Sequence, residues 1–232
     1  MKKKKIGLLG GFSYTSTLQY YKKLMEMYYE RYQDYYYPEL VIYSLDFQRF
    51  TDMENERRLE DYKSYIRYGI DNIKRAGADF FAMTANSPHS VLEEIRPELP
   101  IPVVSIVDAI AEEVKKQGLK KVLLTGIRYT MQSDFYQKGL AKYGIEVIVP
   151  DDAHKDEIND IIFNELCRDI ILDDTREKFK KIISAYDAEG VLLCCTELPL
   201  LLQQKHYNKP VFDSMDIHCK AIIDYALPDD AI

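Results

Sequence analysis

Two short segments of the sequence place a thiol or hydroxyl side chain and polar neighbours directly after an apolar run. Thr84-Ala85-Asn86-Ser87 follows the run 80–83, and Cys195-Thr196-Glu197 follows the run 190–194. In an open parallel α/β sheet, ligands bind beyond the carboxyl ends of such strands. Each segment also precedes a predicted helix, whose free backbone N–H groups and dipole favour a carboxylate. We therefore take the two segments as the candidate functional site.

A thiol and an alcohol that flank a carboxylate-binding cleft suit proton transfer at a carbon acid. One side chain removes a proton from one face of the carbon, and the other returns a proton to the opposite face. A thiol has a pKa of about 8.5 that helix dipoles can lower, so Cys195 is the stronger base of the pair. Each segment alone also has a structural interpretation, as an inert buried cysteine or as a helix cap. Their duplicated placement favours the chemical interpretation.

An internal repeat supports that duplication. Residues 4–10 resemble residues 120–126 at an offset of 116, and residues 81–88 resemble residues 192–199 at an offset of 111. Two matches at nearly one offset indicate two copies of one α/β unit. We therefore predict two pseudosymmetric parallel-sheet α/β domains with the active site in the cleft between them. The predicted boundaries are 1–107 plus 213–232 for the first domain and 108–212 for the second.

Short apolar runs alternate with helical patterns along the whole chain, which is typical of parallel sheets covered by helices. The predicted strands are 5–9, 40–45, 80–83, 102–106, 121–125, 146–149, 190–194 and 211–212. The predicted helices are 13–32, 54–76, 87–95, 108–117, 132–143, 157–168, 174–186 and 215–227. The tyrosines between 20 and 43 indicate a helix surface or a subunit interface.

Composition narrows the class of protein further. The chain has 232 residues, of which 47% are hydrophobic and 30% charged, with a formal net charge of −7. Because nucleic-acid binding needs a basic face, this acidic balance argues against a nucleic-acid partner. No apolar run approaches the roughly 18 residues of a membrane span, so we expect no membrane partner. The four cysteines lack CxxC spacing, which predicts no metal site, no disulfide framework and a cytoplasmic location.

Several motifs together resemble the aspartate/glutamate racemases, and they span nearly the whole chain. Thr84–His89 stands where the family has a Cys-Thr-Asn-Thr-x-His motif. The other matching segments are 7–17, 43–47, 128–131 with 134–136, 158–166, 195–197 and 210–213 with His218. By contrast, the glycines at 7, 10 and 11 lack the spacing of a dinucleotide-binding loop.

The resemblance implies an amino-acid racemase that needs no cofactor and acts on aspartate or glutamate, and we expect a homodimer. In that family two cysteines exchange the α-proton; Cys195 matches the second cysteine, and Thr84 replaces the first. A subset of the family has this Thr/Cys pair and prefers the L-enantiomer. The implied substrate-binding residues are Ser13, Asn86, Ser87, Thr130, Thr196 and Glu197.

A second departure from the family concerns the substrate's side-chain carboxylate. Relatives often hold it with a basic residue at the position that Glu157 occupies here, which leaves Lys155 and Arg49 as candidates. Two alternatives therefore stay open. One is a single-thiol decarboxylase or isomerase of another small carboxylic acid, and the other is a catalytically decayed ligand-binding protein. Proton exchange at the α-carbon distinguishes all three.

Overall fold

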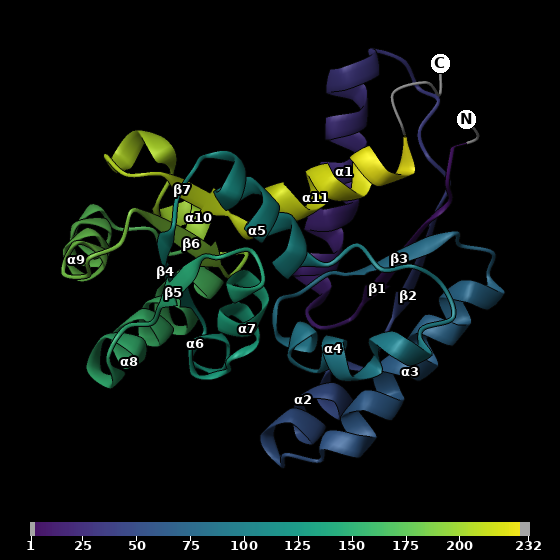
Figure 1. The fold of residues 1–232 in the computed structure, drawn as a ribbon, viewed down its shortest axis with the longest axis horizontal. Helices are drawn as coiled ribbons and strands as arrows, with labels where there is room; N and C mark the ends of the chain where they lie inside the picture. Colours follow the sequence, from purple (N-terminus) through teal and green to yellow (C-terminus); the bar gives the residue numbers. More distant parts are fainter. Residues whose placement is uncertain (1–2, 228–232) are drawn as a thin grey trace. The chain divides into compact units, whose positions relative to one another are not determined.

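The structure, a computed structural model, describes residues 3–227 (Figure 1). The chain divides into two compact units. Unit 1 comprises Met1–Ile106 and His218–Ile232, and unit 2 comprises Val107–Ile217. The outermost parts of the predicted first domain, 1–2 and 228–232, lie outside the described residues.

Unit 1 is built on a three-stranded parallel sheet. Its strands are β1 (Ile6–Gly10), β2 (Leu40–Ser44) and β3 (Phe80–Met83), in the order β2-β1-β3. Its helices are α1 (Tyr14–Tyr32), α2 (Phe47–Asn55), α3 (Leu59–Arg75), α4 (Leu92–Ile95), the 3₁₀ helices η1 (Ser87–Val91) and η2 (Arg96–Glu98), and α11 (Ser214–Ala226) from His218 onward. Every residue of β1 and β3 is buried, as expected for a parallel sheet with helices on both faces.

Unit 2 repeats this plan with four parallel strands. These are β4 (Lys121–Gly126), β5 (Glu146–Ile148), β6 (Gly190–Cys194) and β7 (Val211–Asp213), in the order β5-β4-β6-β7. Its helices are α5 (Ile106–Lys116), α6 (Arg128–Gln132), α7 (Phe135–Ala141), α8 (Asp152–Asp160), α9 (Asp173–Ser184) and α10 (Leu198–Leu201), with a π-helical turn η3 (Ile161–Glu165) and the 3₁₀ helices η4 (Leu166–Arg168) and η5 (Gln204–His206).

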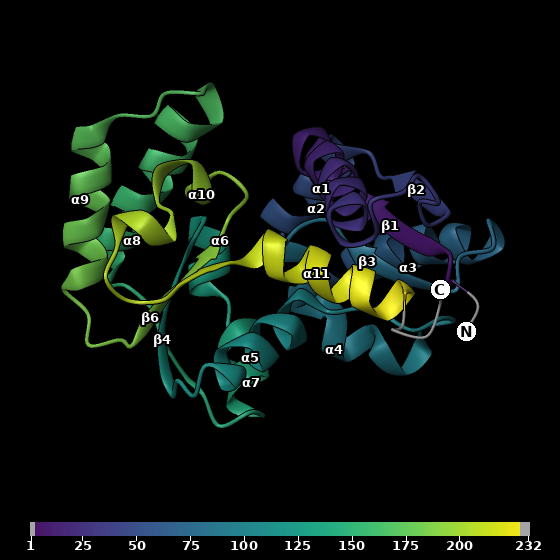
Figure 2. The same ribbon diagram turned by 90° about the horizontal axis from the view of Figure 1, so that it is seen from above.

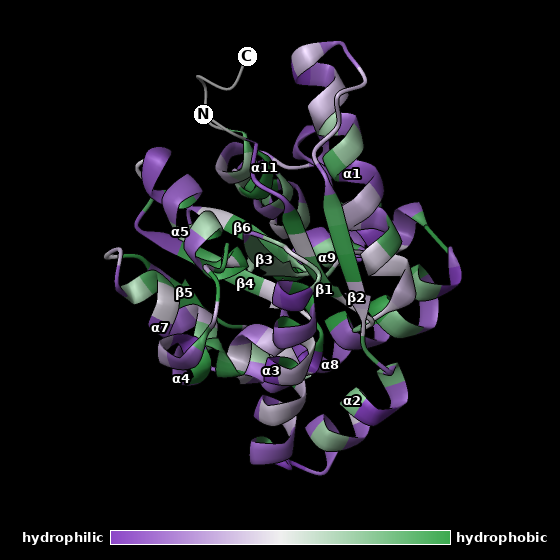
Figure 3. Ribbon diagram, turned by 90° about the vertical axis from the view of Figure 1, so that its right-hand side faces the viewer, coloured by the Kyte–Doolittle hydropathy of each residue, from purple (hydrophilic) through white to green (hydrophobic). Residues whose placement is uncertain are grey.

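Each unit has its own hydrophobic core between its sheet and its helices. In unit 1, α3 packs on one face of the sheet through Ile66, Ile70 and Ile73, and α1 lies on the other (Figure 1). In unit 2, α8 and α9 cover one face of the sheet, whereas α5 and α7 cover the other (Figure 2). The strands are largely hydrophobic, and the helices turn hydrophilic surfaces outward (Figure 3).

The prediction of two parallel-sheet α/β regions is confirmed, but several predicted helices have different bounds. Of the helix predicted over 54–76, residues 59–75 form α3, whereas residues 54–55 are the end of the unpredicted helix α2, and Arg57, with a φ of 54°, lies in the break between them. Of the helix predicted over 132–143, residues 135–141 form α7, whereas Gln132 is the last residue of the unpredicted helix α6 and Ser133 is extended between the two. Of the strand predicted over 102–106, only Val103 pairs with the sheet, at Phe81. Among residues 3–227, no helix has the length and hydropathy to cross a membrane.

Candidate active site

Thr84 immediately follows β3 and is tied to α1 by two hydrogen bonds. The Ser16 hydroxyl donates to the Thr84 carbonyl, and the hydroxyls of Thr84 and Thr17 lie 3.2 Å apart. The Thr17 hydroxyl also reaches the Ser13 carbonyl at 3.0 Å, and it accepts from the Gly11 N–H at 3.1 Å. A carbonyl only accepts, so Thr17 donates its single proton to Ser13. The Thr84 hydroxyl is therefore the donor to Thr17.

The turn after Thr84 is held by buried side chains of unit 1. The Ser87 hydroxyl hydrogen-bonds to the carboxylate of Glu54, whose pKa is raised by burial. The imidazole of His89 bonds to the Ala85 carbonyl through Nδ1 at 3.0 Å and to the Ile106 N–H through Nε2 at 3.3 Å. The carbonyl requires a proton on Nδ1, and the N–H requires a lone pair on Nε2, so His89 is neutral. Burial lowers the pKa of His89 to about 3, which agrees with this assignment.

A second buried histidine continues this network. His218 Nε2 lies 2.9 Å from the Val104 carbonyl, and its Nδ1 lies 2.9 Å from the Tyr20 hydroxyl. Because a carbonyl only accepts, Nε2 carries the proton and Tyr20 donates to Nδ1. Burial lowers the pKa of His218 to about 4. The first segment of unit 1 ends at Ile106 and the second begins at His218, so the two histidines fix the points where the chain leaves and re-enters this unit.

In unit 2, Cys195 immediately follows β6 and is half-buried. Its thiol donates to the Glu197 carboxylate at 3.0 Å, and the Thr196 hydroxyl donates to the same carboxylate oxygen at 2.8 Å. Burial and the negative charge of Glu197 raise the pKa of Cys195 well above its usual value. The Glu197 backbone N–H acts in the opposite direction by donating to the sulfur. The resting form of this site is therefore a thiol whose proton points at a carboxylate.

Thr130 is a buried residue of α6 with an unsatisfied hydroxyl. Its side-chain oxygen has no hydrogen-bond partner within the part of the chain that the structure describes. The Thr130 side chain packs against Gly126 at the carboxyl end of β4, where an added Cβ would lie 2.9 Å from the Cys194 carbonyl oxygen. An unsatisfied buried hydroxyl is costly, so this position is suited to a bound polar group.

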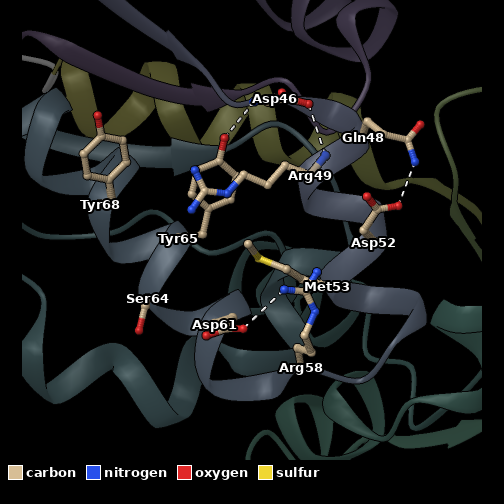
Figure 4. A pocket seen from close by; sticks show the side chains of 10 residues that line it. All are labelled: Asp46, Gln48, Arg49, Asp52, Met53, Arg58, Asp61, Ser64, Tyr65 and Tyr68. Carbon is tan, nitrogen blue, oxygen red and sulfur yellow. Dashed lines mark hydrogen bonds and ion pairs between the residues drawn. The ribbon is translucent and has the colours of Figure 1, made fainter.

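Arg49 lies in a pocket of about 680 Å³ between α2 and α3 (Figure 4). Its guanidinium stacks over the Tyr65 ring, 4.4 Å from the ring centroid. The carboxylates that line the pocket have other partners: Asp46 accepts from the Arg49 backbone N–H, Asp52 from Gln48, and Asp61 from Arg58. Among residues 3–227, the Arg49 side chain has no carboxylate within ion-pair distance, whereas the other basic candidate, Lys155, and the acidic residue Glu157 are both in ion pairs. Lys155 pairs with Asp152, and Glu157 pairs with Lys178.

The structure thus brings the predicted residues together in two groups. In unit 1, Ser13 caps the N-terminus of α1 by accepting from the Ser16 N–H, and Thr84, Asn86 and Ser87 follow β3. In unit 2, Cys195, Thr196 and Glu197 form one hydrogen-bonded cluster after β6. Chemical reasoning from the sequence did not identify Thr17 and Glu54. Both make their contacts through the fold; Thr17 lies in the matching segment 7–17, but nothing in that segment indicates a contact with Thr84.

The plan of two parallel-sheet α/β units recurs in solved structures of racemases. An aspartate racemase homologue from Pyrococcus horikoshii is 44% identical with a TM-score of 0.87, covering 96% of this chain and 99% of that one. The Picrophilus torridus aspartate racemase is 26% identical with a TM-score of 0.75, covering 96% and 94%. The broad specificity amino-acid racemase RacX of Bacillus subtilis is 28% identical over 227 residues, covering 94% of this chain and 96% of RacX.

The model of the Asp/Glu/Hydantoin racemase family matches residues 9–222. The chain belongs to that family, so the resemblance inferred from its motifs is confirmed. Racemases are isomerases, and the expected class of enzyme is confirmed with it.

Proposed function

We propose that the enzyme racemises aspartate or glutamate without a cofactor, with Cys195 as the main acid/base and Thr84 on the opposite face of the α-carbon. The observation that carries the proposal is the contact between the Cys195 thiol and the Glu197 carboxylate. A protonated thiol is a poor base, and the charge of Glu197 opposes its ionisation. Once the thiol has lost its proton to solvent, the thiolate accepts from the Glu197 backbone N–H and can abstract an α-proton.

The two catalytic groups differ strongly in acidity. Thr84 offers an alcohol whose proton is already donated to Thr17, and an alcohol is a far weaker acid than a thiol. Each pKa unit of difference corresponds to 1.36 kcal/mol. We therefore expect the Cys195 side to exchange the α-proton much faster than the enzyme inverts the carbon. The family resemblance assigns the L-enantiomer to the Cys195 side.

This asymmetry does not make racemisation one-way. The two enantiomers have equal free energies, so kcat/KM has the same value in both directions. A preference for the L-enantiomer therefore appears in the rate of α-proton exchange, in KM or in kcat taken separately. It does not appear in the equilibrium position.

The substrate would be held by polar groups from both units. Asn86, Ser13 and Ser87 are the candidates in unit 1, and Thr130, Thr196 and Glu197 are the candidates in unit 2. The unsatisfied Thr130 hydroxyl supports its role, while the Ser87 hydroxyl already bonds to Glu54, which leaves its backbone N–H for the substrate. Arg49 is our candidate for the side-chain carboxylate, because the other candidate, Lys155, is engaged in an ion pair with Asp152.

Deuterium exchange tests the proposal directly. L-Aspartate and L-glutamate are incubated with the enzyme in deuterated water, α-deuterium is followed by proton NMR, and the product is resolved on a chiral column. We expect rapid incorporation of α-deuterium and slower inversion, loss of both in Cys195→Ser, and faster inversion in Thr84→Cys. If Cys195→Ser still exchanges the α-proton at the wild-type rate, the mechanism is wrong.

The same experiment separates the alternatives. A decarboxylase or isomerase of another small carboxylic acid gives no α-deuterium with amino acids but turns over its own substrate, and a decayed binding protein shows no turnover. Arg49→Met provides the matched test of substrate class, because it removes the charge and keeps an unbranched side chain. We expect it to raise KM for aspartate and glutamate far more than for alanine.

A further inference from the structure

The hydroxyl of Thr17 has one proton and two acceptors within reach. The Ser13 carbonyl lies 3.0 Å away and the Thr84 hydroxyl oxygen 3.2 Å away. While Thr84 keeps its own proton, Thr17 donates to Ser13 and accepts from Thr84. The Gly11 N–H also donates to the Thr17 oxygen, and such a chain of hydrogen bonds polarises the Thr17 O–H. Thr17 is therefore well placed to change acceptors.

The backbone is shaped to allow this contact. Gly10 ends β1 next to Thr17, and a Cβ added at Gly10 would lie 2.5 Å from Thr17 Cγ2 and 2.7 Å from Thr17 Oγ1. Because real atoms do not approach so closely, only glycine at this position lets Thr17 reach from α1 across the end of β1 to Thr84. Thr17 itself is 7% exposed, so bulk water does not compete for its hydroxyl.

We propose that Thr17 is the positioning residue for inversion, because its hydroxyl turns from the Ser13 carbonyl to the Thr84 oxygen when Thr84 gives up its proton. The inference rests on the function proposed above. In the step concerned, the Thr84 O–H bond breaks, a C–H bond forms on the α-carbon, and the negative charge of the carbanion moves to the Thr84 oxygen. Solvent water later returns a proton to Thr84, and the proton taken by Cys195 leaves to solvent.

The acceptor that Thr17 prefers depends on the charge of the Thr84 oxygen. A hydrogen bond to an ionised oxygen is roughly twice as strong as one between neutral groups, so the developing alkoxide outcompetes the Ser13 carbonyl. Ser13 then loses one of two hydrogen bonds and keeps the one from the Thr17 backbone N–H. Removing one hydrogen-bond donor to a developing oxyanion typically lowers kcat by about 10²–10³-fold. Thr17 therefore governs inversion, whereas exchange from the Cys195 side does not pass through it.

The test compares Thr17→Val, which keeps the shape and removes the hydroxyl, with Thr17→Ser, which keeps the hydroxyl. α-Deuterium exchange and inversion of L-aspartate or L-glutamate are measured for both variants. We expect Thr17→Val to lower inversion roughly 100-fold with KM little changed, and to lower exchange far less. Thr17→Ser should keep inversion within a few-fold of wild type. Thr51→Val is the control, because Thr51 makes the same bond to a carbonyl four residues back, in α2.

Two further variants keep the test decisive. Where wild-type inversion is too slow to quantify, the comparison is made in the Thr84→Cys background, in which the same hydroxyl donates to a thiolate. There Thr17→Val should also move the rise of inversion with pH to higher pH. Where Thr17→Val does not fold, as judged by circular dichroism, Thr17→Cys replaces it, since a thiol of similar size is a weaker donor.

Equal inversion rates in Thr17→Val and Thr17→Ser would overturn the inference, as would a parallel loss of exchange and inversion. Failure of the proposed function gives a different result. In that case the wild-type enzyme itself incorporates no α-deuterium into aspartate or glutamate.

Discussion

The Glu197 carboxylate suppresses the thiolate of Cys195, and Glu197→Gln removes the charge while keeping an oxygen near the sulfur. The contacting atoms are 3.0 Å apart. Two unit charges at about 4 Å interact by about 1 kcal/mol in water and about 4 kcal/mol at an effective dielectric constant of 20. The half-buried thiol lies between these limits. Removing the charge should therefore raise the thiolate fraction below the thiol pKa by between about fivefold and about a thousandfold.

The gain in rate is smaller than the gain in thiolate. A thiolate of lower pKa is a weaker base, so each thiolate reacts more slowly. With a Brønsted coefficient of about 0.5, the net gain in rate is about the square root of the gain in thiolate fraction. Exchange of the α-proton on the acidic side should rise between about twofold and about thirtyfold, and the plateau at high pH should fall by the same factor. The sign follows from the charge: a neighbouring anion disfavours the thiolate, so its removal moves the rising part of the pH profile to lower pH.

The assay is α-deuterium incorporation into saturating L-substrate across pH, together with alkylation of the free enzyme by iodoacetamide, read at Cys195 by mass spectrometry. Glu189→Gln is the control, because it removes an equal charge beside the amino ends of β4 and β6, where Glu189 binds the N–H groups of Lys120 and Lys121. A pH profile that stays in place in Glu197→Gln, or moves to higher pH, refutes the reasoning.

Two further predictions concern the buried histidines and the surface of α1. His89 and His218 have pKa values lowered from 6.5 to about 3 and about 4, so their contribution to stability is complete above pH 6.5 and is lost as the pH falls. Each histidine should lower the free energy of unfolding in urea by about 2 kcal/mol between pH 7.5 and pH 5. His218→Gln should lose less stability than wild type over that range, and an equal loss would contradict the assignment. Tyr14, Leu18 and Tyr21 share one face of α1 and are 77%, 60% and 46% exposed, so we propose that this face forms the homodimer. Light scattering should show a dimer for wild type and for the control Leu59→Glu but a monomer for Leu18→Glu, whereas a dimer in all three would exclude this face.

The sequence predicted the strands well and the breaks between helices poorly, for a physical reason. Buried parallel strands are short apolar runs, and such runs are visible one residue at a time. Arg57 is an exposed residue in the left-handed region, which arginine rarely adopts, so its residue type gives no signal of a break. Ser133 is a residue type that favours helix ends, but a single serine is too weak a signal to place the break between α6 and α7. The start of α8 did have a local signal, because the Asp151 side chain accepts from the His154 N–H as an N-cap.

The residues of the candidate site also differ in how far the sequence can predict them. Thr84 and Cys195 can be located because each directly follows an apolar strand. Their partners depend on contacts between distant parts of the chain. Thr17 lies 67 residues from Thr84, and Tyr20 lies 198 residues from His218. No spacing rule reaches that far, so these hydrogen bonds only become visible once the sheets are assembled.

Duplication of the fold therefore does not duplicate the chemistry. Both units end a buried strand in a proton-bearing side chain at the start of a turn. In unit 1 that proton points at another hydroxyl, Thr17, which leads to a backbone carbonyl that cannot take it. In unit 2 the proton points at the carboxylate of Glu197, whose charge holds it on the sulfur. The same strand end thus holds an acid/base in unit 2, whereas in unit 1 it holds a weak proton donor whose charge must be stabilised by a neighbour. The exchange of sulfur for oxygen, together with this difference in hydrogen-bond partners, is what we expect to separate the rate of proton exchange from the rate of inversion.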